Sequence, residues 1–382
     1  MASNDTRTMP LATEEITLGW LQNIFQNKHI SSFDITRTCL DETTSKISMV
    51  LGYDDEKDND DNQKKDARPK HILLKGGFNP AMLAAPGYKQ FLIGAYTREV
   101  DFYTRFIGSQ AMADKLNGGL QVPKVYWADA SPEQAILAFE DLAAAGYVFG
   151  DPTNTYSIAA VHMGLDQLAA LHAATWGWDV ASPGSPNAWL EHNVYDATFR
   201  AVINMWDDTK AADDRAPMAT IIRDNRERTL RAVEAYLTTR SPRFRCLLHG
   251  DAHSGNIYMD TFDGPSKLRF LDWQIVHIGS AFHDVAYFII AMLPVTKRRT
   301  HELALIDYYL AALARHGGPK IFRDKDPEVM VEYRKSAITG VGWMVTPHTM
   351  QNKERVVAMV ERYTAAMEDH RTIDILLGEK AT

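Results

Sequence analysis

The strongest constraint on the fold is a β-hairpin pattern between residues 245 and 274, RCLLHGDAHSGNIYMDTFDGPSKLRFLDWQ. Two apolar runs, IYM and KLRFLDW, flank TFDGPS, whose Asp-Gly-Pro sequence is typical of a turn. An antiparallel pair brings the start of its first strand beside the end of its second. Asn256 and Asp272 occupy those two places, so the sequence predicts an amide oxygen and a carboxylate side by side.

Oxygen atoms of this kind suit a hard cation such as Mg²⁺. Asp251 lies in the turn that leads into the hairpin, where its carboxylate could accept a proton from a substrate hydroxyl. An aspartate in a turn is often only a backbone-bonding residue, but a carboxylate buried at a strand end is costly without a cation. Together the three residues favour Asp251 as a catalytic base, with Asn256 and Asp272 as metal ligands.

The two histidines of this stretch, His249 and His253, raise the alternative of a zinc site. No further His or Cys pair lies nearby at a spacing usual for zinc, so supporting roles are favoured. We expect His249 to hydrogen-bond the backbone and hold the loop. His253 either braces the loop or contacts phosphate. Cys39 and Cys246 are the only cysteines, too few for a disulfide framework, and Cys246 is predicted to lie in the core.

The chain has 382 residues, more than one compact core usually supports, so two lobes are expected. Its formal net charge of −8 argues against nucleic acid as a partner. The longest apolar run, VAYFIIAML, is shorter than the roughly 20 residues that span a bilayer, and the N-terminus lacks a signal-peptide core. A cytoplasmic protein without a membrane partner is therefore predicted; the oligomeric state is not.

Hydrophobic periodicity changes along the chain and predicts an α+β fold. The acidic segment 54–66 contains no hydrophobic residue and is predicted to be a loop. A small antiparallel-sheet lobe is expected over residues 1–139 and a larger, mainly helical lobe over residues 140–382. The expected helices are 13–26, 96–107, 156–176, 220–237 and 356–377, and the expected strands are 33–40, 46–53, 69–77 and two within 122–142.

The phrase HGDAHSGN followed by LDW resembles the catalytic and metal-binding loops of the aminoglycoside phosphotransferase and choline kinase superfamily, small-molecule relatives of protein kinases. The phrases EEITLGWL, AFEDLAAAGYVFGD, LAALHAATWG and DWQ resemble its ecdysteroid-kinase-like branch in particular. The resemblance implies a bilobal protein-kinase-like fold, with a nucleotide-binding N-lobe. The C-lobe would hold the catalytic loop, the metal site and the acceptor site.

The resemblance also implies ATP and Mg²⁺ as cofactors and assigns residues to them. Lys75 in HILLK looks like the phosphate-binding lysine, and Glu99 in REVDFY like the glutamate that orients it. LAFEDL, with Glu140 and Leu142, looks like the segment whose backbone meets adenine. HIGSAFHDVAYF looks like a structural segment after the metal loop. Asp284, within it, and His172 are predicted to be structural.

One departure concerns the loop between the first two strands, LDETTSK, which has no glycine to let backbone N–H groups approach phosphate. Either Thr43, Thr44 or Ser45 caps the phosphates, or ATP use is impaired. We expect an active kinase that phosphorylates a hydroxyl group of a small molecule. A catalytically weak pseudokinase with a binding or regulatory role, an aminoglycoside-type antibiotic kinase and a metal-dependent hydrolase remain alternatives.

The acceptor site is expected among the variable helices of the C-lobe, which carry several aromatic side chains. These are Trp176, Trp178, Trp189, Trp206 and Trp343. Such apolar, amphipathic surface favours an apolar alcohol, steroid-like or another natural product. An acidic group could instead attract a cationic amino sugar, or form a solvated helix end. Its members are Asp207, Asp208, Asp213 and Asp214.

Overall fold

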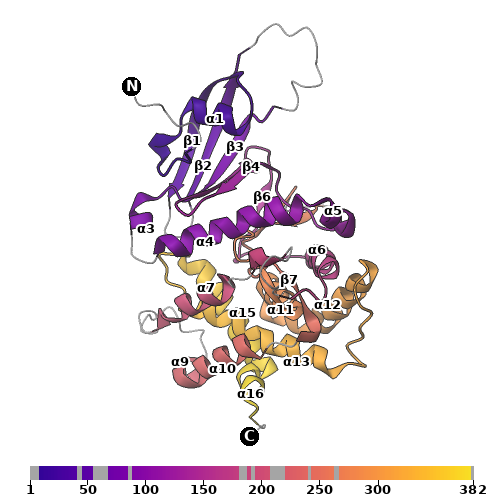
Figure 1. The fold of residues 1–382 in the computed structure, drawn as a ribbon. Helices are drawn as coiled ribbons and strands as arrows, with labels where there is room; N and C mark the ends of the chain where they lie inside the picture. The colour runs from indigo at the N-terminus through magenta and orange to yellow at the C-terminus, as the bar shows by residue number, and fades with distance from the viewer. Residues whose placement is uncertain are drawn as a thin grey trace. The chain divides into compact units, whose positions relative to one another are not determined.

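A computed structural model of the chain describes residues 8–40, 45–54, 68–84, 88–179, 187–190, 194–206, 220–239, 242–261 and 266–379. The chain forms two compact units (Figure 1). The first consists of Met1–Phe106 and Pro123–Tyr147, the second of Ile107–Val122 and Val148–Thr382. A strand-rich N-terminal unit and a mainly helical C-terminal unit confirm the predicted α+β architecture. The division differs from the expected boundary at 139/140, because Ile107–Val122 groups with the second unit and residues 140–147 group with the first.

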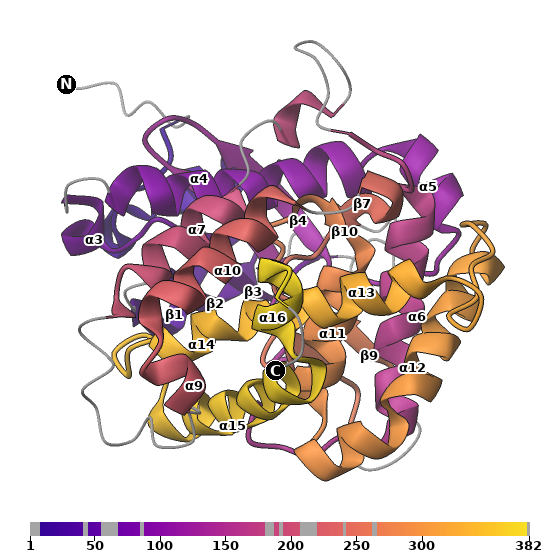
Figure 2. The ribbon, with the colours of Figure 1, turned by 90° about the horizontal axis from the view of Figure 1, so that it is seen from below.

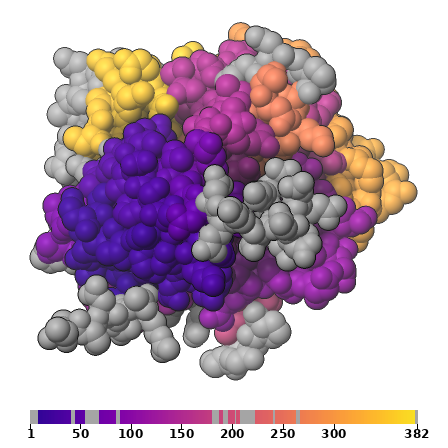
Figure 3. Space-filling view, turned by 90° about the horizontal axis from the view of Figure 1, so that it is seen from above, coloured from indigo at the N-terminus to yellow at the C-terminus, as the bar shows by residue number. Residues whose placement is uncertain are grey.

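The first unit is built on a five-stranded antiparallel sheet of order β1-β2-β3-β5-β4. The strands are β1 Ile30–Leu40, β2 Ser45–Tyr53, β3 His71–Gly76, β4 Val125–Ala130 and β5 Ala135–Glu140. Alternate residues of β2 and β3 face a core that α1 (Leu18–Ile24) covers. Trp20 of α1 meets Trp127 of β4 edge to face, with ring centroids 5.6 Å apart. These strands confirm those that the sequence predicted. In the space-filling view of Figure 3, the N-terminal residues of this unit are coloured indigo.

Two helices of the first unit begin at other residues than the sequence predicted. The expected start at Thr13 is wrong: residues 13–15 form one 3-10 turn (η1), and α1 begins at Leu18. The reason is the Thr17 side chain, which caps α1 by accepting the Trp20 N–H at 3.2 Å. The helix expected over 96–107 is the end of α4 (Tyr88–Asp101), continued by a π-helical turn, η2 (Phe102–Ile107). A short helix, α3 (Pro80–Ala84), precedes α4.

The second unit packs its helices around α11 (Ala281–Met292), every residue of which is buried. The apolar run VAYFIIAML is therefore a core helix, and within the described ranges no helix is both long and apolar enough to cross a membrane. Around it lie α6 and α12, seen from below in Figure 2. The helices are α5 Gln110–Leu116, α6 Ile158–Ala174, α7 Val194–Ile203, α9 Thr220–Arg223, α10 Arg226–Thr238, α12 Val295–Arg315, α13 Pro327–Ser336, α14 Val341–Val345, α15 Lys353–His370 and α16 Thr372–Leu377, with 3-10 turns η3 Ala188–Leu190, η5 Pro242–Phe244 and η6 Ala337–Gly340.

Two helices that the sequence predicted as continuous are interrupted. The helix expected over 220–237 divides into α9 and α10, and that over 356–377 divides into α15 and α16. Arg371, between α15 and α16, has a φ of 52°, a left-handed conformation that ends a helix. The predicted acidic loop lies outside the described residues except for Asp54, as do the four acidic residues of 207–214.

Candidate active site

Two strands and a glycine shape the start of the loop that contains Asp251. Strand β7 (Arg245–Leu248) pairs antiparallel with β10 (His277–Ser280) and ends where the loop begins. Gly250 follows with a φ of 85°, and a Cβ at this position would lie 2.6 Å from the Ile275 carbonyl oxygen. Only glycine meets both conditions without strain, so this residue fixes the direction in which Asp251 leaves the strand.

Asp284 of α11 holds this loop from the core side. Its buried carboxylate accepts the N–H of His249 at 2.7 Å and that of Gly250 at 3.0 Å. His172 Nε2 lies 3.2 Å from the same carboxylate. Burial opposes ionisation of Asp284, but the His172 hydrogen bond and the charges of neighbouring histidines outweigh it and lower its pKa. Asp284 and His172 therefore make the structural contacts that the sequence predicted.

The Asp251 side chain remains reachable from solvent, with 30% of its area exposed. Asn256 Nδ2 donates to both the Asp251 carbonyl oxygen and Oδ2, each at 3.0 Å. His253 Nε2 lies 3.5 Å from the same Oδ2. Burial raises the pKa of Asp251, but the His253 charge and hydrogen bond, the His249 charge and a Tyr287 hydrogen bond together lower it to about 2. Asp251 is therefore an oriented carboxylate at neutral pH.

The hairpin predicted from the sequence is present and places the Asn256 and Asp272 segments side by side. Strand β8 (Ile257–Met259) pairs with β9 (Leu268–Phe270), and the Leu271 N–H donates to the Asn256 carbonyl oxygen at 3.0 Å. With β6 (Val148–Phe149) they form a three-stranded sheet. The second strand is shorter than KLRFLDW, because Asp272 has a φ of 68° and leaves the strand. Asp272 is half-buried.

The two histidines of the loop contact its backbone. His249 Nδ1 accepts the Asp251 N–H at 3.2 Å, so Nε2 is the nitrogen that donates to the Leu271 carbonyl oxygen at 3.0 Å. Burial lowers the pKa of His249, which favours this neutral form. His253 Nδ1 accepts the Gly255 N–H at 2.9 Å and braces the loop, while its contact with phosphate stays a prediction.

The donor set at the hairpin fits a hard cation. Because the Asn256 amide nitrogen makes both hydrogen bonds to Asp251, the amide oxygen is the atom left to meet a cation. The Asp272 carboxylate would be its partner, with phosphate and water oxygens completing the shell. Within the described ranges, no three His, Cys, Asp or Glu side chains are grouped to hold a metal ion.

In the first unit, the predicted nucleotide-binding pair is formed. Ile72 and Leu74 of β3 face the α1 side of the sheet, so the alternating position of Lys75 faces away from it. Lys75 Nζ lies 2.5 Å from Glu99 Oε2 of α4, and their side chains are 6% and 1% exposed. A buried ion pair of this kind fixes the position of the ammonium group.

The other residues predicted to contact the nucleotide make backbone hydrogen bonds within the first unit. Ser45 is 3% exposed, and its N–H donates to the Tyr96 hydroxyl at 3.1 Å. The Glu140 N–H donates to the Lys124 carbonyl oxygen, and the Leu142 carbonyl oxygen accepts the Tyr147 N–H. Phosphate and adenine contacts of Ser45, Glu140 and Leu142 stay predictions, and residues 41–44, with Thr43 and Thr44, lie outside the described residues.

The tryptophans proposed as acceptor surface divide into two groups. Trp176, Trp178 and Trp189 are half-buried, whereas Trp206 is fully buried and Trp343 is 6% exposed, so the prediction of surface for the last two is wrong. Trp343 Nε1 instead donates to the Tyr287 hydroxyl at 2.7 Å. The sequence reasoning missed Tyr287. Its three-residue spacing from Asp284 in HDVAY, which puts both on one helix face, was the available signal.

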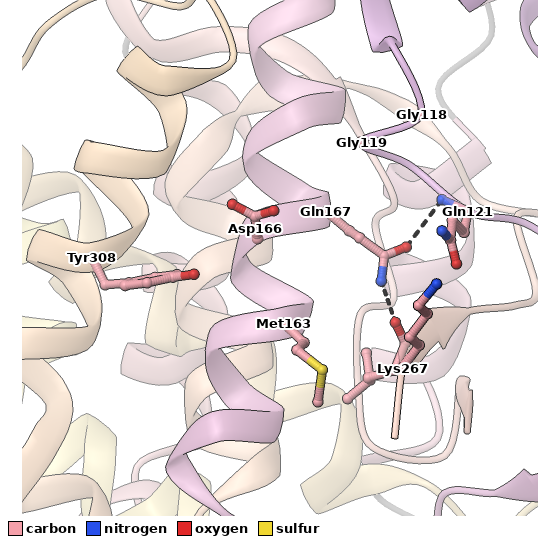
Figure 4. Close-up of a pocket in the computed structure, with 9 residues that line it drawn as sticks. Gly118, Gly119, Gln121, Met163, Asp166, Gln167, Lys267 and Tyr308 are labelled. Atoms are coloured by element: carbon pink, nitrogen blue, oxygen red, sulfur yellow. Dashed lines mark hydrogen bonds between the residues drawn. The ribbon is translucent and has the colours of Figure 1, made fainter. Parts of the chain in front are cut away.

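Hydrogen bonds connect β9 of the hairpin to α6 and to residues 118–121. The Gln167 side chain accepts the Gln121 N–H at 3.1 Å and donates to the Leu268 carbonyl oxygen (Figure 4). Arg269 Nε donates to Gln121 Oε1 at 2.9 Å. A cavity of about 230 Å³ opens here, and it is lined by Gly118, Gly119, Gln121, Met163, Asp166, Gln167, Lys267, Leu268 and Tyr308. None of these lining residues is a predicted site residue.

Comparison with known families and structures shows what this chain is similar to. A family model for the ecdysteroid kinase-like family matches residues 62–318, about two thirds of the chain. No curated protein gives a significant match. Similar solved structures include an ethanolamine kinase from Plasmodium vivax, with 14% identity, coverage of 93% of this chain and 87% of that one, and a TM-score of 0.49. A choline kinase from Cryptosporidium parvum has 13% identity, coverage of 96% and 93%, and a TM-score of 0.47.

Proposed function

The chain belongs to the ecdysteroid kinase-like family, and from this premise we propose that it is an ATP- and Mg²⁺-dependent phosphotransferase acting on a hydroxyl group of a small molecule. The observation that carries the proposal is the solvent-reachable Asp251 carboxylate, oriented by Asn256 beside the hairpin end that bears Asp272. This reaction would take place where ATP is supplied, in the cytoplasm.

Asp251 would orient the acceptor hydroxyl and receive its proton. A pKa of about 2 makes this carboxylate a weak base, so the proton would transfer late, as the bond to phosphorus forms. That timing suits phosphoryl transfer, whose transition state asks for positioning and charge neutralisation more than for strong nucleophile activation. Bound Mg²⁺–ATP supplies the phosphoryl group and part of the neutralising charge. Asn256 and Asp272 would hold the ion, and Lys75, fixed by Glu99, would neutralise phosphate oxygens.

Replacement of the proposed base tests this assignment. We expect Asp251→Ala to bind ATP nearly as the wild type does and to lose turnover, because the residue meets the acceptor rather than the nucleotide. Nucleotide binding by calorimetry and ADP release by a coupled assay measure the two effects. Asp260→Ala is the control: Asp260 lies on the same hairpin, but it is 40% exposed and paired with Arg269. ATP consumption by Asp251→Ala near the wild-type rate would contradict the mechanism.

For the acceptor, we propose an apolar alcohol such as a steroid-like compound or another natural product. The name of the family and the half-buried Trp176, Trp178 and Trp189 support this class. A screen of hydroxylated metabolites by mass spectrometry would show the acceptor as an ATP-dependent gain of one phosphate group. Inclusion of amino sugars in the screen tests the cationic alternative, and selective phosphorylation of those compounds would overturn the proposed class.

A pseudokinase is the second candidate, supported by the first unit. The loop before β2 lacks glycine, and the Ser45 N–H at its end is already bonded to Tyr96. Nucleotide binding without phosphate transfer to any acceptor, under conditions where the protein is folded, would favour this function over the kinase.

A further inference from the structure

Gly250 gives the Asp251 loop its geometry but also leaves the backbone free to rotate there. Its φ of 85° suits glycine, and a Cβ at this position would lie 2.6 Å from the Ile275 carbonyl oxygen, so no side chain fits. The same lack of a side chain lets the peptide groups on either side of a glycine rotate at low cost. Because the second of these peptide groups leads into Asp251, its orientation determines where the carboxylate points.

Two successive residues of α11 hold both of these peptide groups. Asp284 Oδ1 accepts the Gly250 N–H at 3.0 Å, which fixes the peptide group between His249 and Gly250. His283 Nε2 lies 3.0 Å from the Gly250 carbonyl oxygen, which belongs to the peptide group between Gly250 and Asp251. A backbone carbonyl oxygen can only accept, so Nε2 is the nitrogen that carries the hydrogen. Helix α11 thus removes the freedom that the glycine brings.

Two tyrosines, one from α10 and one from α7, fix the imidazole of His283 in turn. In a neutral imidazole whose Nε2 carries the hydrogen, Nδ1 accepts, and the Tyr236 hydroxyl donates to it at 2.8 Å. The Tyr195 ring meets the His283 ring edge to face, with ring centroids 4.7 Å apart. Tyr236 and His283 are only 3% and 1% exposed, so little water reaches either hydrogen bond.

We propose that His283 is a positioning residue for Asp251, which it orients through the carbonyl group of Gly250, and that Tyr236 keeps its imidazole in place. This inference rests on the proposed phosphotransferase function and gives two residues outside the catalytic loop a part in the reaction.

The consequence for catalysis concerns the direction of the Asp251 carboxylate. Asn256 Nδ2 donates to Asp251 Oδ2 and to the Asp251 carbonyl oxygen, so it restrains the residue from the hairpin. The His283 hydrogen bond restrains the peptide group before the residue, from α11. A displacement of about 1 Å at a reacting group can cost on the order of 10²-fold in rate. Loss of the His283 N–H should therefore lower kcat, while KM for ATP, which does not depend on the direction of Asp251, should stay unchanged.

The first experiment compares two variants of His283 in steady-state kinetics. The acceptor is the one that the metabolite screen identifies; without one, phosphate release from Mg²⁺–ATP is followed. His283→Phe keeps a ring but loses the N–H, and we expect kcat to fall about 10- to 100-fold with KM for ATP unchanged. His283→Gln places an amide N–H at a similar distance from the backbone and should recover most of this loss. The opposite order of the two variants would show that the ring itself is required and would overturn the proposal.

Tyr236→Phe tests the second half of the inference. It should lower kcat less than His283→Phe does, and the double variant should lose no more than His283→Phe alone, because Tyr236 acts through His283. Tyr333→Phe is the matched control, since Tyr333 is also buried and its hydroxyl donates to Glu302 of α12, likewise at 2.8 Å. Its kcat should equal that of the wild type. An equal loss in this control, or independent additive losses for Tyr236 and His283, would contradict the assigned roles.

A second measurement does not depend on activity. Amide hydrogen exchange, followed by mass spectrometry without nucleotide, reports how firmly the backbone of residues 249–256 is held. Exchange in this segment should be faster in His283→Phe than in the wild type and unchanged in Tyr333→Phe. Wild-type exchange in His283→Phe would overturn this inference alone, whereas a folded wild-type protein without Mg²⁺–ATP turnover would overturn the proposed function.

Discussion

The backbone of Asp272 carries strain that can be measured. Its φ of 68° is a conformation that residues with a Cβ adopt at a cost and glycine adopts freely. We expect Asp272→Gly to be more stable than Asp272→Ala by about 1 kcal/mol, although both lose the carboxylate and therefore activity. Urea unfolding measures the difference. At Asp260, which does not have a positive φ, the order of the Gly and Ala variants should reverse; a more stable Asp272→Ala would contradict the assigned strain.

Among single residues, the sequence predicted the positions of those that lie close to one another along the chain. Asp251, Asn256 and Asp272 lie within one hairpin and its leading turn, so the turn and the strand pairing were enough to bring Asn256 and the Asp272 segment together. Trp343 donates a hydrogen bond to Tyr287 from a helix far along the chain, and no local pattern reports such a contact. The burial of Trp206 and Trp343 was unpredictable for the same reason.

Helices α12, α13 and α15 meet at a buried carboxylate, that of Glu302. Glu302 Oε1 accepts from Arg298 at 2.9 Å, His370 at 3.0 Å and Tyr333 at 2.8 Å. Burial raises the pKa of Glu302, but the hydrogen bond and charge of His370 and those of Arg298 outweigh it and lower the pKa below 4.5. Since the folded pKa is depressed, the carboxylate stabilises the fold above the unfolded value and loses this contribution as the pH falls through the folded value.

Glu302→Gln should therefore destabilise the protein by about 3 kcal/mol at neutral pH, and the difference from wild type should shrink below about pH 4.5. Chemical denaturation across a pH series measures it. Glu234→Gln is the matched control, because Glu234 also pairs with an arginine, Arg200, but its side chain is 52% exposed. There the change should stay below about 1 kcal/mol. A Glu302→Gln effect that does not vary with pH would contradict the ionised assignment.

Element type was easier to predict than element ends. The apolar alternation of β2 and β3 and the helical stripe of α6 depend on burial that the sequence encodes directly. The start of α1 depends on a single Thr17 hydrogen bond, and the break after α15 on one left-handed residue, Arg371. Such local events change a boundary without changing the hydrophobic pattern.

For the whole molecule, the proposed function predicts a stabilisation by ATP that depends on Mg²⁺. At a nucleotide concentration 100 times the dissociation constant, folding should gain about 2.7 kcal/mol, which thermal unfolding detects. Removal of Mg²⁺ with a chelator should reduce the gain, since Asn256 and Asp272 would then lack their ion. Asp272→Asn should show the reduced gain even with Mg²⁺ present. An identical shift with and without Mg²⁺ would contradict the metal assignment.

The chain crosses between its two units three times, because Ile107–Val122 belongs to the second unit while Pro123–Tyr147 returns to the first. During synthesis, Gln121 leaves the ribosome well before Gln167 and Arg269, its partners in the second unit. Neither unit can therefore be completed before the other has begun, and no single cut yields two whole pieces. A truncation at 139/140 would leave α5 and the 118–121 segment on the wrong fragment. A chimera that exchanges one unit with that of a relative would have to be joined at all three of these junctions.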